Sequence, residues 1–295
     1  MSRSQANFLL LVAAAFWGFG NVAQKTVLEH LDPFSAVGLR CLIGGVLILP
    51  LLRLDRSGLV APGYWPSVIR VAVIFAAALL AQQAAYLSTT VTNAGFLVNT
   101  AAILTPILAW IVYRERPSLH VWGASGASLI GVFMLCGGMQ GFGKGDFVAL
   151  FSALLYAVWM VDLGRHMQTF GHPVRTACTQ FLVAAAIALP IGGLWGSLSA
   201  GAALAAGPEL LLLGVGSTAL AFGLQTLAQR YTPASYAAVI VSAEGVFGAM
   251  AAALFLGERI TLVAMLGAAL MLAAIVHLAF GSAPKPVRVR TAARA

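Results

Sequence analysis

Residues 91–116 of the chain read VTNAGFLVNTAAILTPILAWIVYRER, and no charged side chain occurs between Val91 and Tyr113. A helix over this run is long enough to cross a hydrocarbon core about 30 Å thick. Similar apolar runs recur along all 295 residues, of which only 9% are charged, compared with about 25% in an ordinary soluble protein. Because so few charges cannot cover the surface of a soluble fold, the sequence predicts an all-α membrane protein.

We expect ten transmembrane helices, joined by short connections that make successive helices antiparallel neighbours. The predicted spans are 6–24, 34–52, 68–87, 91–113, 120–138, 146–165, 175–196, 208–229, 233–257 and 260–280. With the N-terminus inside, most Lys and Arg residues fall on the cytoplasmic side, and only Lys25, Lys144 and Arg259 fall on the other. This imbalance predicts that both termini are cytoplasmic. It also accounts for most of the net charge of +8, so no nucleic-acid partner is needed to explain that charge.

The opening stretch has a second copy later in the chain, at residues 234–259, which read ASYAAVIVSAEGVFGAMAAALFLGER. Matched residues are 143 positions apart and include Gln82 with Gln225, Asn99 with Ser242, and Glu115-Arg116 with Glu258-Arg259. Earlier in each half, Trp17 falls opposite Tyr156 and Pro50 opposite Pro190. We therefore predict two five-helix repeats at 1–140 and 141–281, followed by a basic cytoplasmic tail at 282–295. Because five is odd, the repeats must be inverted, an arrangement typical of secondary transporters.

Each half has an aromatic residue near the middle of its first helix, Trp17 or Tyr156, and a Glu-Arg step that closes its fourth. In these features, residues 6–280 resemble the EamA repeats of the drug/metabolite transporter superfamily. The resemblance is strongest to bacterial exporters of amino acids, including the aromatic branch, and it implies outward transport. Two departures bear on the substrate. Gly245 follows Glu244 where the family often has Pro, and Arg114 stands where a small residue usually precedes Glu115.

Enzyme motifs are few. Gly143-Lys144-Gly145-Asp146 matches the Gly-x-Gly-Asp signature of intramembrane aspartyl proteases, but that chemistry needs a second, facing carboxylate, and the preceding predicted helix contains none. Asp146 at the start of a helix is typical of a cap. Cys41, Cys136 and Cys178 lie in apolar runs and indicate buried small side chains. We predict no enzyme activity, no catalytic residues, no metal and no cofactor.

Charges inside predicted spans are costly and suggest function. Glu244 lies near the middle of the ninth span, where the first half has Ala101. It could bind a substrate ammonium, carry a proton, or hold helices together by a hydrogen bond. Arg40, opposite Gln180 in the repeat, could bind a carboxylate, although snorkelling toward the interface is the stronger reading. For Asp162 and Arg165, one turn apart, we predict a local ion pair.

Polar and aromatic residues at helical spacing indicate a cavity. Lipid would reject a glutamine at mid-depth, so Gln82 and Gln225 are expected to face the interior. Thr105-Pro106 is expected to kink the fourth helix. The predicted substrate-binding residues are Trp17, Asn21, Gln82, Tyr86, Phe96, Asn99, Tyr156, Trp159, Gln225 and Glu244.

These features together favour a secondary transporter in a bacterial-type inner membrane. We predict that it exports amino acids, including aromatic ones, or similar small amphipathic metabolites by alternating access. The expected partners are the substrate and the lipid bilayer, and the expected oligomeric state is a monomer. Two alternatives stay open: a membrane-embedded enzyme acting on lipid-linked intermediates, and a non-transporting membrane sensor or scaffold.

Overall fold

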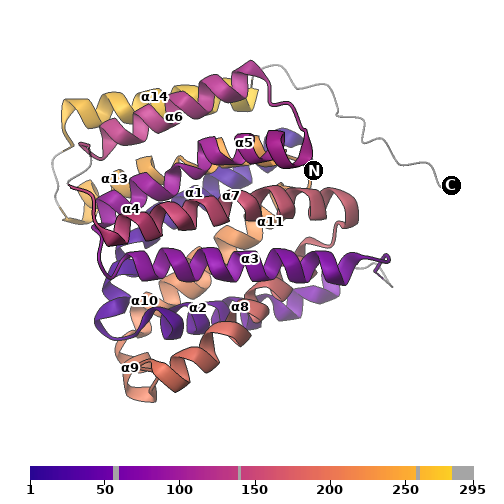
Figure 1. Cartoon of the computed structure of the whole chain (residues 1–295), viewed down its shortest axis with the longest axis vertical. Coiled ribbons are helices and arrows are strands. Elements are labelled where there is room, and N and C mark those ends of the chain that lie inside the picture. The colour runs from indigo at the N-terminus through magenta and orange to yellow at the C-terminus, as the bar shows by residue number, and fades with distance from the viewer. Residues whose placement is uncertain (56–59, 139–140, 257–259, 281–295) are drawn as a thin grey trace.

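The computed structural model describes residues 1–55, 60–138, 141–256 and 260–280, and within these ranges it contains helices and no strands (Figure 1). Ten apolar spans follow one another, as the sequence predicts. They are α1 (Arg3–Thr26), α2 (Pro33–Ile48), α3 (Tyr64–Ala85), α4 (Val91–Asn99) with α5 (Ala101–Tyr113), α6 (Leu119–Leu135), α7 (Lys144–Phe170), α8 (Pro173–Trp195), α10 (Gly207–Leu211) with the π-helical η3 (Leu212–Phe222) and α11 (Gly223–Ala228), α12 (Ala234–Val241) with α13 (Glu244–Leu256), and α14 (Leu262–Phe280). The short helices η1 (Val27–Glu29), η2 (Leu49–Leu54) and α9 (Ala200–Ala205) lie in connections.

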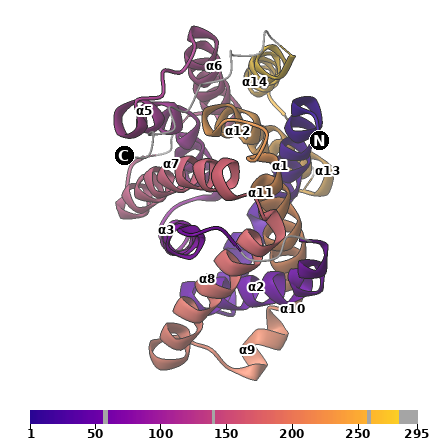
Figure 2. The ribbon, with the colours of Figure 1, turned by 90° about the vertical axis from the view of Figure 1, so that its right-hand side faces the viewer.

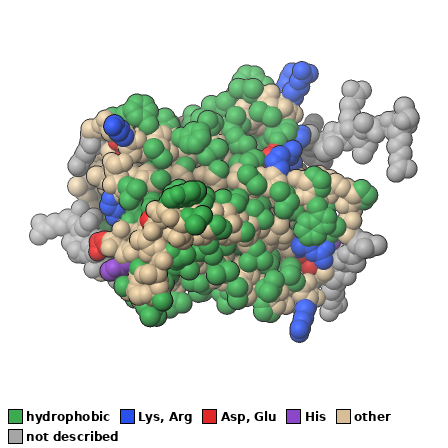
Figure 3. Space-filling model, turned by 60° about the horizontal axis from the view of Figure 1, so that its bottom comes forward, with side chains coloured by type: hydrophobic (Ala, Val, Ile, Leu, Met, Phe, Trp, Pro, Cys, Tyr) green, Lys and Arg blue, Asp and Glu red, His purple; other side chains and the backbone are tan. Residues whose placement is uncertain are grey.

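Nine of the described helical spans are long and apolar enough to cross a membrane, and α6 is a shorter apolar helix. Hydrophobic side chains cover the middle of the face seen in Figure 3, and charged side chains gather mainly toward its two ends. The chain is therefore a multi-pass membrane protein. Glu258-Arg259 and the predicted basic tail lie outside the described residues.

Local sequence signals set several helix starts. Asp32 caps α2 by accepting from the backbone N–H groups of Phe34 and Ser35, and Pro33 follows it at the first helical position. Partial burial alone would raise the pKa of Asp32, but its hydrogen bonds from Ser35, Ser197 and Phe34 outweigh this effect and lower the pKa. Asp146 also serves a helix start, since its carboxylate accepts from the backbone N–H of Gly143 at 2.7 Å.

Contacts at the two ends of the bundle show that the second half is inverted. At the end where α1 finishes, here called the Lys25 end, Lys25 Nζ donates to the Thr89 carbonyl at 3.3 Å, and Thr89 Oγ1 donates to Asp146 at the start of α7. At the opposite end, where α1 begins, here called the Arg3 end, Asn7 hydrogen-bonds to Thr232 and to the carbonyl of Ala279 in α14. The matched helices α1 and α7 therefore run in opposite directions (Figure 1).

The two halves also pack through matched helices. The second helices of the halves, α2 and α8, lie against each other, and so do the fifth helices, α6 and α14 (Figure 2). The approach of α6 to α14 is close because both carry glycine at the crossing. A Cβ on Gly131 would lie 2.7 Å from the Gly267 carbonyl oxygen, and one on Gly267 would lie 2.5 Å from the Gly131 carbonyl oxygen. Backbone contact of this kind is typical of small residues in membrane helices.

The fourth helix of each half is interrupted at matched positions. The first break lies at Thr100, between α4 and α5, and the second lies between Val241 and Glu244. The first break is not at the expected Pro106, since α5 continues through that proline, and Ser125 Oγ donates to the Ala102 carbonyl that the proline leaves free. Instead, side chains just before each break bond to carbonyls of the preceding turn, as Asn99 does to Gly95 and Ser242 does to Val239. Such bonds compete with the helix ladder.

The expected ion pair between Asp162 and Arg165 is wrong. Asp162, 4% exposed, pairs with Arg70 of α3 at 3.0 Å and accepts a hydrogen bond from Tyr113 of α5. Arg165 lies over the ring of Tyr113 and reaches Glu115 at 3.4 Å. The physical reason is tertiary packing, which places longer-range partners from α3 and α5 beside each residue.

Candidate functional site

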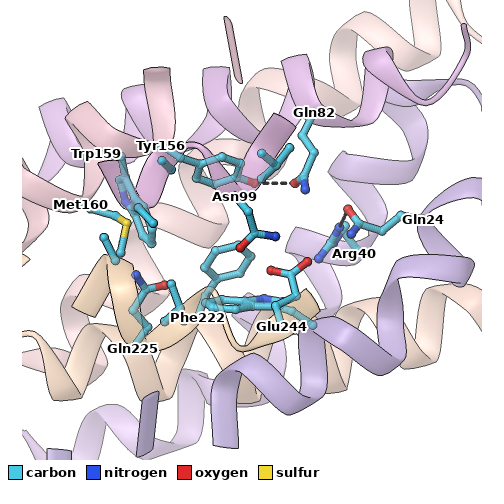
Figure 4. A pocket seen from close by; sticks show the side chains of 16 residues that line it. Gln24, Arg40, Gln82, Asn99, Tyr156, Trp159, Met160, Phe222, Gln225 and Glu244 are labelled. Carbon is cyan, nitrogen blue, oxygen red and sulfur yellow. Dashed lines mark hydrogen bonds between the residues drawn. The ribbon is translucent and has the colours of Figure 1, made fainter. Parts of the chain in front are cut away.

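A cavity of about 70 Å³ lies in the interior, where helices of both halves meet (Figure 4). The first half contributes α1, α2, α3, α4 and α5, and the second contributes α7, η3, α11, α12 and α13. The lining residues are Trp17, Gln24, Arg40, Gln82, Val98, Asn99, Ala101, Ala102, Tyr156, Trp159, Met160, Phe222, Gln225, Ala238, Val241 and Glu244. Both helix breaks border this space, through Asn99 and Ala101 on one side and Glu244 on the other.

An aromatic wall forms one part of the lining. Phe222 of η3 lies at its centre, with its ring centroid 4.7 Å from that of Trp17 and 5.6 Å from that of Trp159. Tyr156 continues the wall at 6.0 Å from Trp159. The Trp17 indole is fixed by its Nε1, which donates to the Ser217 carbonyl at 3.1 Å. Residues from α1, α7 and η3 thus build one apolar surface of the cavity.

Amide side chains line another part of the cavity. Tyr156 OH donates to Gln82 Oε1 at 2.7 Å, which joins α7 to α3 (Figure 4). Gln225 of α11, matched to Gln82 in the repeat, has a buried Oε1 with no hydrogen-bond partner among the described residues. A buried amide oxygen without a partner is costly. Gln225 therefore leaves an unused hydrogen-bond acceptor at the cavity.

Two ionisable side chains of opposite type, Glu244 and Arg40, lie at the polar end of the cavity and are joined by a chain of hydrogen bonds. Glu244 Oε1 accepts from Asn21 Nδ2 at 2.8 Å, and Asn21 Oδ1 accepts from Gln24 Nε2 at 3.0 Å. Gln24 Oε1 in turn accepts from Arg40 Nη1 at 3.3 Å, and Arg40 Nε donates to Thr218 Oγ1 at 3.0 Å. Figure 4 shows that the Glu244 and Arg40 side chains reach the cavity from different helices.

The structure brings most of the sequence-predicted site residues together. Trp17, Gln82, Asn99, Tyr156, Trp159, Gln225 and Glu244 all line the cavity. Asn21 does not line it but holds Glu244. Tyr86 is buried away from the lining, and its backbone carbonyl accepts from Lys25. Phe96 also lies elsewhere, with its ring 5.5 Å from that of Phe133. Whether the lining residues bind substrate stays a prediction.

Sequence reasoning underestimated Arg40. Its side chain does not snorkel outward: the residue is 1% exposed and lines the cavity, because Gln24 and Thr218 offer acceptors in the interior. The signal was present, since Arg40 is a charge within an apolar run whose repeat partner is Gln180. Gln24 could have been found by its helical spacing from Asn21. Nothing in the sequence distinguishes Phe222 from other apolar residues of its span.

The cavity is small for a metabolite. Sites for small molecules usually measure about 300–1,000 Å³, several times the 70 Å³ found here. A ligand of amino-acid size would therefore need the surrounding helices to move apart. The interrupted helices beside the cavity are places where such movement costs few backbone hydrogen bonds.

A cavity between inverted repeats, bordered by discontinuous helices, is typical of secondary transporters. The comparison with known families agrees with this class. Residues 4–137 and 143–280 each match the EamA-like transporter family. The chain belongs to this family, within the drug/metabolite transporter superfamily, and carries two copies of its repeat.

Two relatives are similar over most of the chain. An uncharacterized transporter of Archaeoglobus fulgidus is 27% identical over 280 residues, which cover 94% of this chain and 86% of the relative. The uncharacterized transporter YwfM of Bacillus subtilis is 26% identical over 297 residues, which cover 97% of each. A crystal structure of another protein matches with a TM-score of 0.78 and 17% identity, over 95% of this chain and 97% of that one. This last likeness shows that the fold is shared.

Proposed function

We propose that this EamA-family transporter exports amino acids, including aromatic ones, or similar small amphipathic metabolites. The observation that carries the proposal is the mixed chemistry of the central cavity. Trp17, Trp159 and Phe222 form an apolar wall, while Gln82, Gln225 and Glu244 supply polar groups beside it. A solute with an apolar side chain and a polar head matches both parts of the lining.

We propose further that transport proceeds by alternating access. Contacts between the halves occur at both ends of the bundle, Thr89 with Asp146 at the Lys25 end and Thr232 with Asn7 at the Arg3 end. These pairs are matched in the repeat, so breaking one or the other gives related conformations that open opposite ends. The small volume of the cavity supports a cycle in which the substrate enters only after one end has opened.

Uptake into proteoliposomes tests the proposed function. Labelled phenylalanine is expected to accumulate, and Trp17→Ala or Gln82→Ala is expected to slow uptake by about tenfold, the equivalent of about 1.4 kcal/mol. The matched controls are Trp195→Ala, which removes an 80% exposed tryptophan, and Gln168→Ala, which removes an exposed glutamine. Size-exclusion profiles identify variants that fail to fold. Normal uptake by both folded cavity variants would contradict the assignment of the site.

The proposed orientation places the Arg3 end in the cytoplasm, on the basis of the Lys and Arg imbalance. In a variant with Cys41, Cys136 and Cys178 changed to Ala, an impermeant thiol reagent added outside cells should label Ala205→Cys at the Lys25 end. The same reagent should miss Ala61→Cys at the Arg3 end. Both alanines are exposed. The reverse pattern would turn the proposed orientation around.

A further inference from the structure

Arg40 and Glu244, the basic and the acidic residue of the cavity, do not form an ion pair with each other. Arg40 is 1% exposed, and its hydrogen-bond acceptors, Gln24 and Thr218, are neutral. Glu244 is held by the neutral amide of Asn21. Within the described ranges, the ion pairs join Arg70 to Asp162 and Arg165 to Glu115. Both cavity charges thus lie in a desolvated space with neutral hydrogen-bond partners.

A buried guanidinium without a counter-ion is costly, because burial removes its hydration and neutral acceptors only partly replace it. Arg has five N–H donors in a planar fork, which suits a carboxylate in a bidentate arrangement. A group of higher negative charge, such as a phosphate dianion, would be repelled by the nearby Glu244. Glu244 instead favours a cation next to the anion that Arg40 receives.

The repeat shows that the scaffold does not require these charges. The position matched to Glu244 is Ala101, which also lines the cavity. The position matched to Arg40 is Gln180, whose amide is satisfied by Trp159 Nε1 at 3.1 Å and Thr226 Oγ1 at 2.9 Å. The same helix positions are therefore filled by neutral residues in the other half. The charges are features of the cavity and not of the fold.

We infer that the cavity selects zwitterions, with the substrate carboxylate on Arg40 and the substrate ammonium on Glu244. Asn21 and Gln24, one turn apart on α1, bind Glu244 and Arg40 respectively and so tie both side chains to neighbouring positions of one helix. The apolar side chain of the substrate lies against the wall formed by Trp17, Trp159 and Phe222. This inference rests on the proposed function and deepens it, since it assigns the two ends of the head group to two named residues.

Binding in detergent tests the inference separately from transport. Phenylalanine, phenethylamine and N-acetylphenylalanine share one side chain, and the last two lack the carboxylate and the ammonium respectively. In the wild type, phenylalanine should stabilise the protein against heat at about a tenfold lower concentration than either analogue, since each lost charged hydrogen bond is worth about that factor. This comparison needs no variant to fold.

Charge-neutral variants then assign the groups. Arg40→Gln should abolish the preference for phenylalanine over phenethylamine and keep the preference over N-acetylphenylalanine. Glu244→Gln should do the opposite. Arg53→Gln and Glu29→Gln remove exposed charges outside the cavity and should keep both preferences.

The outcomes separate the two proposals. Equal stabilisation by all three compounds, or by none, would overturn zwitterion selection even if transport is observed. Phenylalanine that binds with the expected preferences but is not moved by proteoliposomes would overturn the transport function and leave the inference standing.

Discussion

The two ends of the bundle are held by matched residues of the two halves, but the chemistry of the two contacts differs. At the Lys25 end, Thr89 donates to the carboxylate of Asp146 at 2.5 Å, and Asn93 Nδ2 and the Gly143 N–H donate to the same carboxylate. At the Arg3 end, the matched Thr232 donates to the neutral Asn7 at 2.9 Å.

The duplicated fold thus fixes where the two halves touch, and the residue at each matched position sets how strongly they are held together. Hydrogen bonds to a charged acceptor contribute about 1.5–3 kcal/mol each, and neutral ones about 0.5–1.5 kcal/mol. Within the first half, the Lys25 ammonium also donates to the carbonyls of Tyr86 and Thr89, just after α3, where a cation is favoured by the helix dipole. At the matched contact itself, the Lys25 end is therefore held more strongly, while the Arg3 end has the additional ion pairs of Arg70 with Asp162 and Arg165 with Glu115.

The largest expected effect comes from Gly145, next to Asp146. A Cβ at this position would lie 2.6 Å from the carbonyl carbon and 2.7 Å from the carbonyl oxygen of Ser88, and backbone atoms cannot rotate away. Gly145→Val should therefore force the Lys25 end apart and abolish transport, beyond the usual overpacking cost of about 1–3 kcal/mol. A thiol introduced at Ala101 in the cavity should then react with external reagents, which is measured by labelling.

The control for Gly145→Val is Gly126→Val on α6, because a Cβ at Gly126 meets no atom within 4 Å. The position matched to Gly145 is Ala6, which already carries a Cβ and is fully buried. If Gly145→Val transports at the wild-type rate while Ala101→Cys stays protected, the close approach at the Lys25 end has no role in closure.

The helical spans and several cavity residues could be predicted from the sequence, because the length of an apolar run indicates a membrane-spanning helix and the repeat spacing shows which residues are matched. The ten spans follow from run length, and the pairing of Gln82 with Gln225 led to two residues that both line the cavity. Glu244 stood out because a carboxylate in an apolar run is costly. Such signals depend on the local sequence and its distance from the matching copy.

Other features depend on which neighbours a residue meets in three dimensions. Phe96 and Asn99 are three residues apart on α4, yet only Asn99 lines the cavity, while the Phe96 ring packs against Phe133 of α6, a neighbour that sequence spacing does not show. The Arg40 side chain points into the interior because its hydrogen-bond acceptors, Gln24 and Thr218, lie there on other helices. The partner of Asp162 is Arg70 for the same reason.

The next effect in size comes from removing the acceptor at each end. Asp146→Ala leaves three donors without their carboxylate, whereas Asn7→Ala leaves only Thr232 without an acceptor. We expect a loss of stability of about 3 kcal/mol or more for Asp146→Ala and about 1 kcal/mol for Asn7→Ala. Melting in detergent gives the ranking. Equal shifts would show that the charge of Asp146 adds nothing to the contact.

The smallest and most symmetric change replaces each threonine by valine, which keeps the shape and removes one hydroxyl. Thr89→Val should cost about 1.5–3 kcal/mol because its acceptor, Asp146, is charged and 3% exposed. Thr232→Val should cost about 0.5–1.5 kcal/mol because its acceptor, Asn7, is neutral. The two variants should also shift access in opposite directions. With Cys at position 101, Thr89→Val should raise labelling from outside the cell, and Thr232→Val should raise labelling from the cytoplasmic side. If labelling rises on the same side for both variants, the matched threonines do not control opposite ends. The repeat symmetry would then apply to the arrangement of the helices and not to the side-chain contacts that close the two ends.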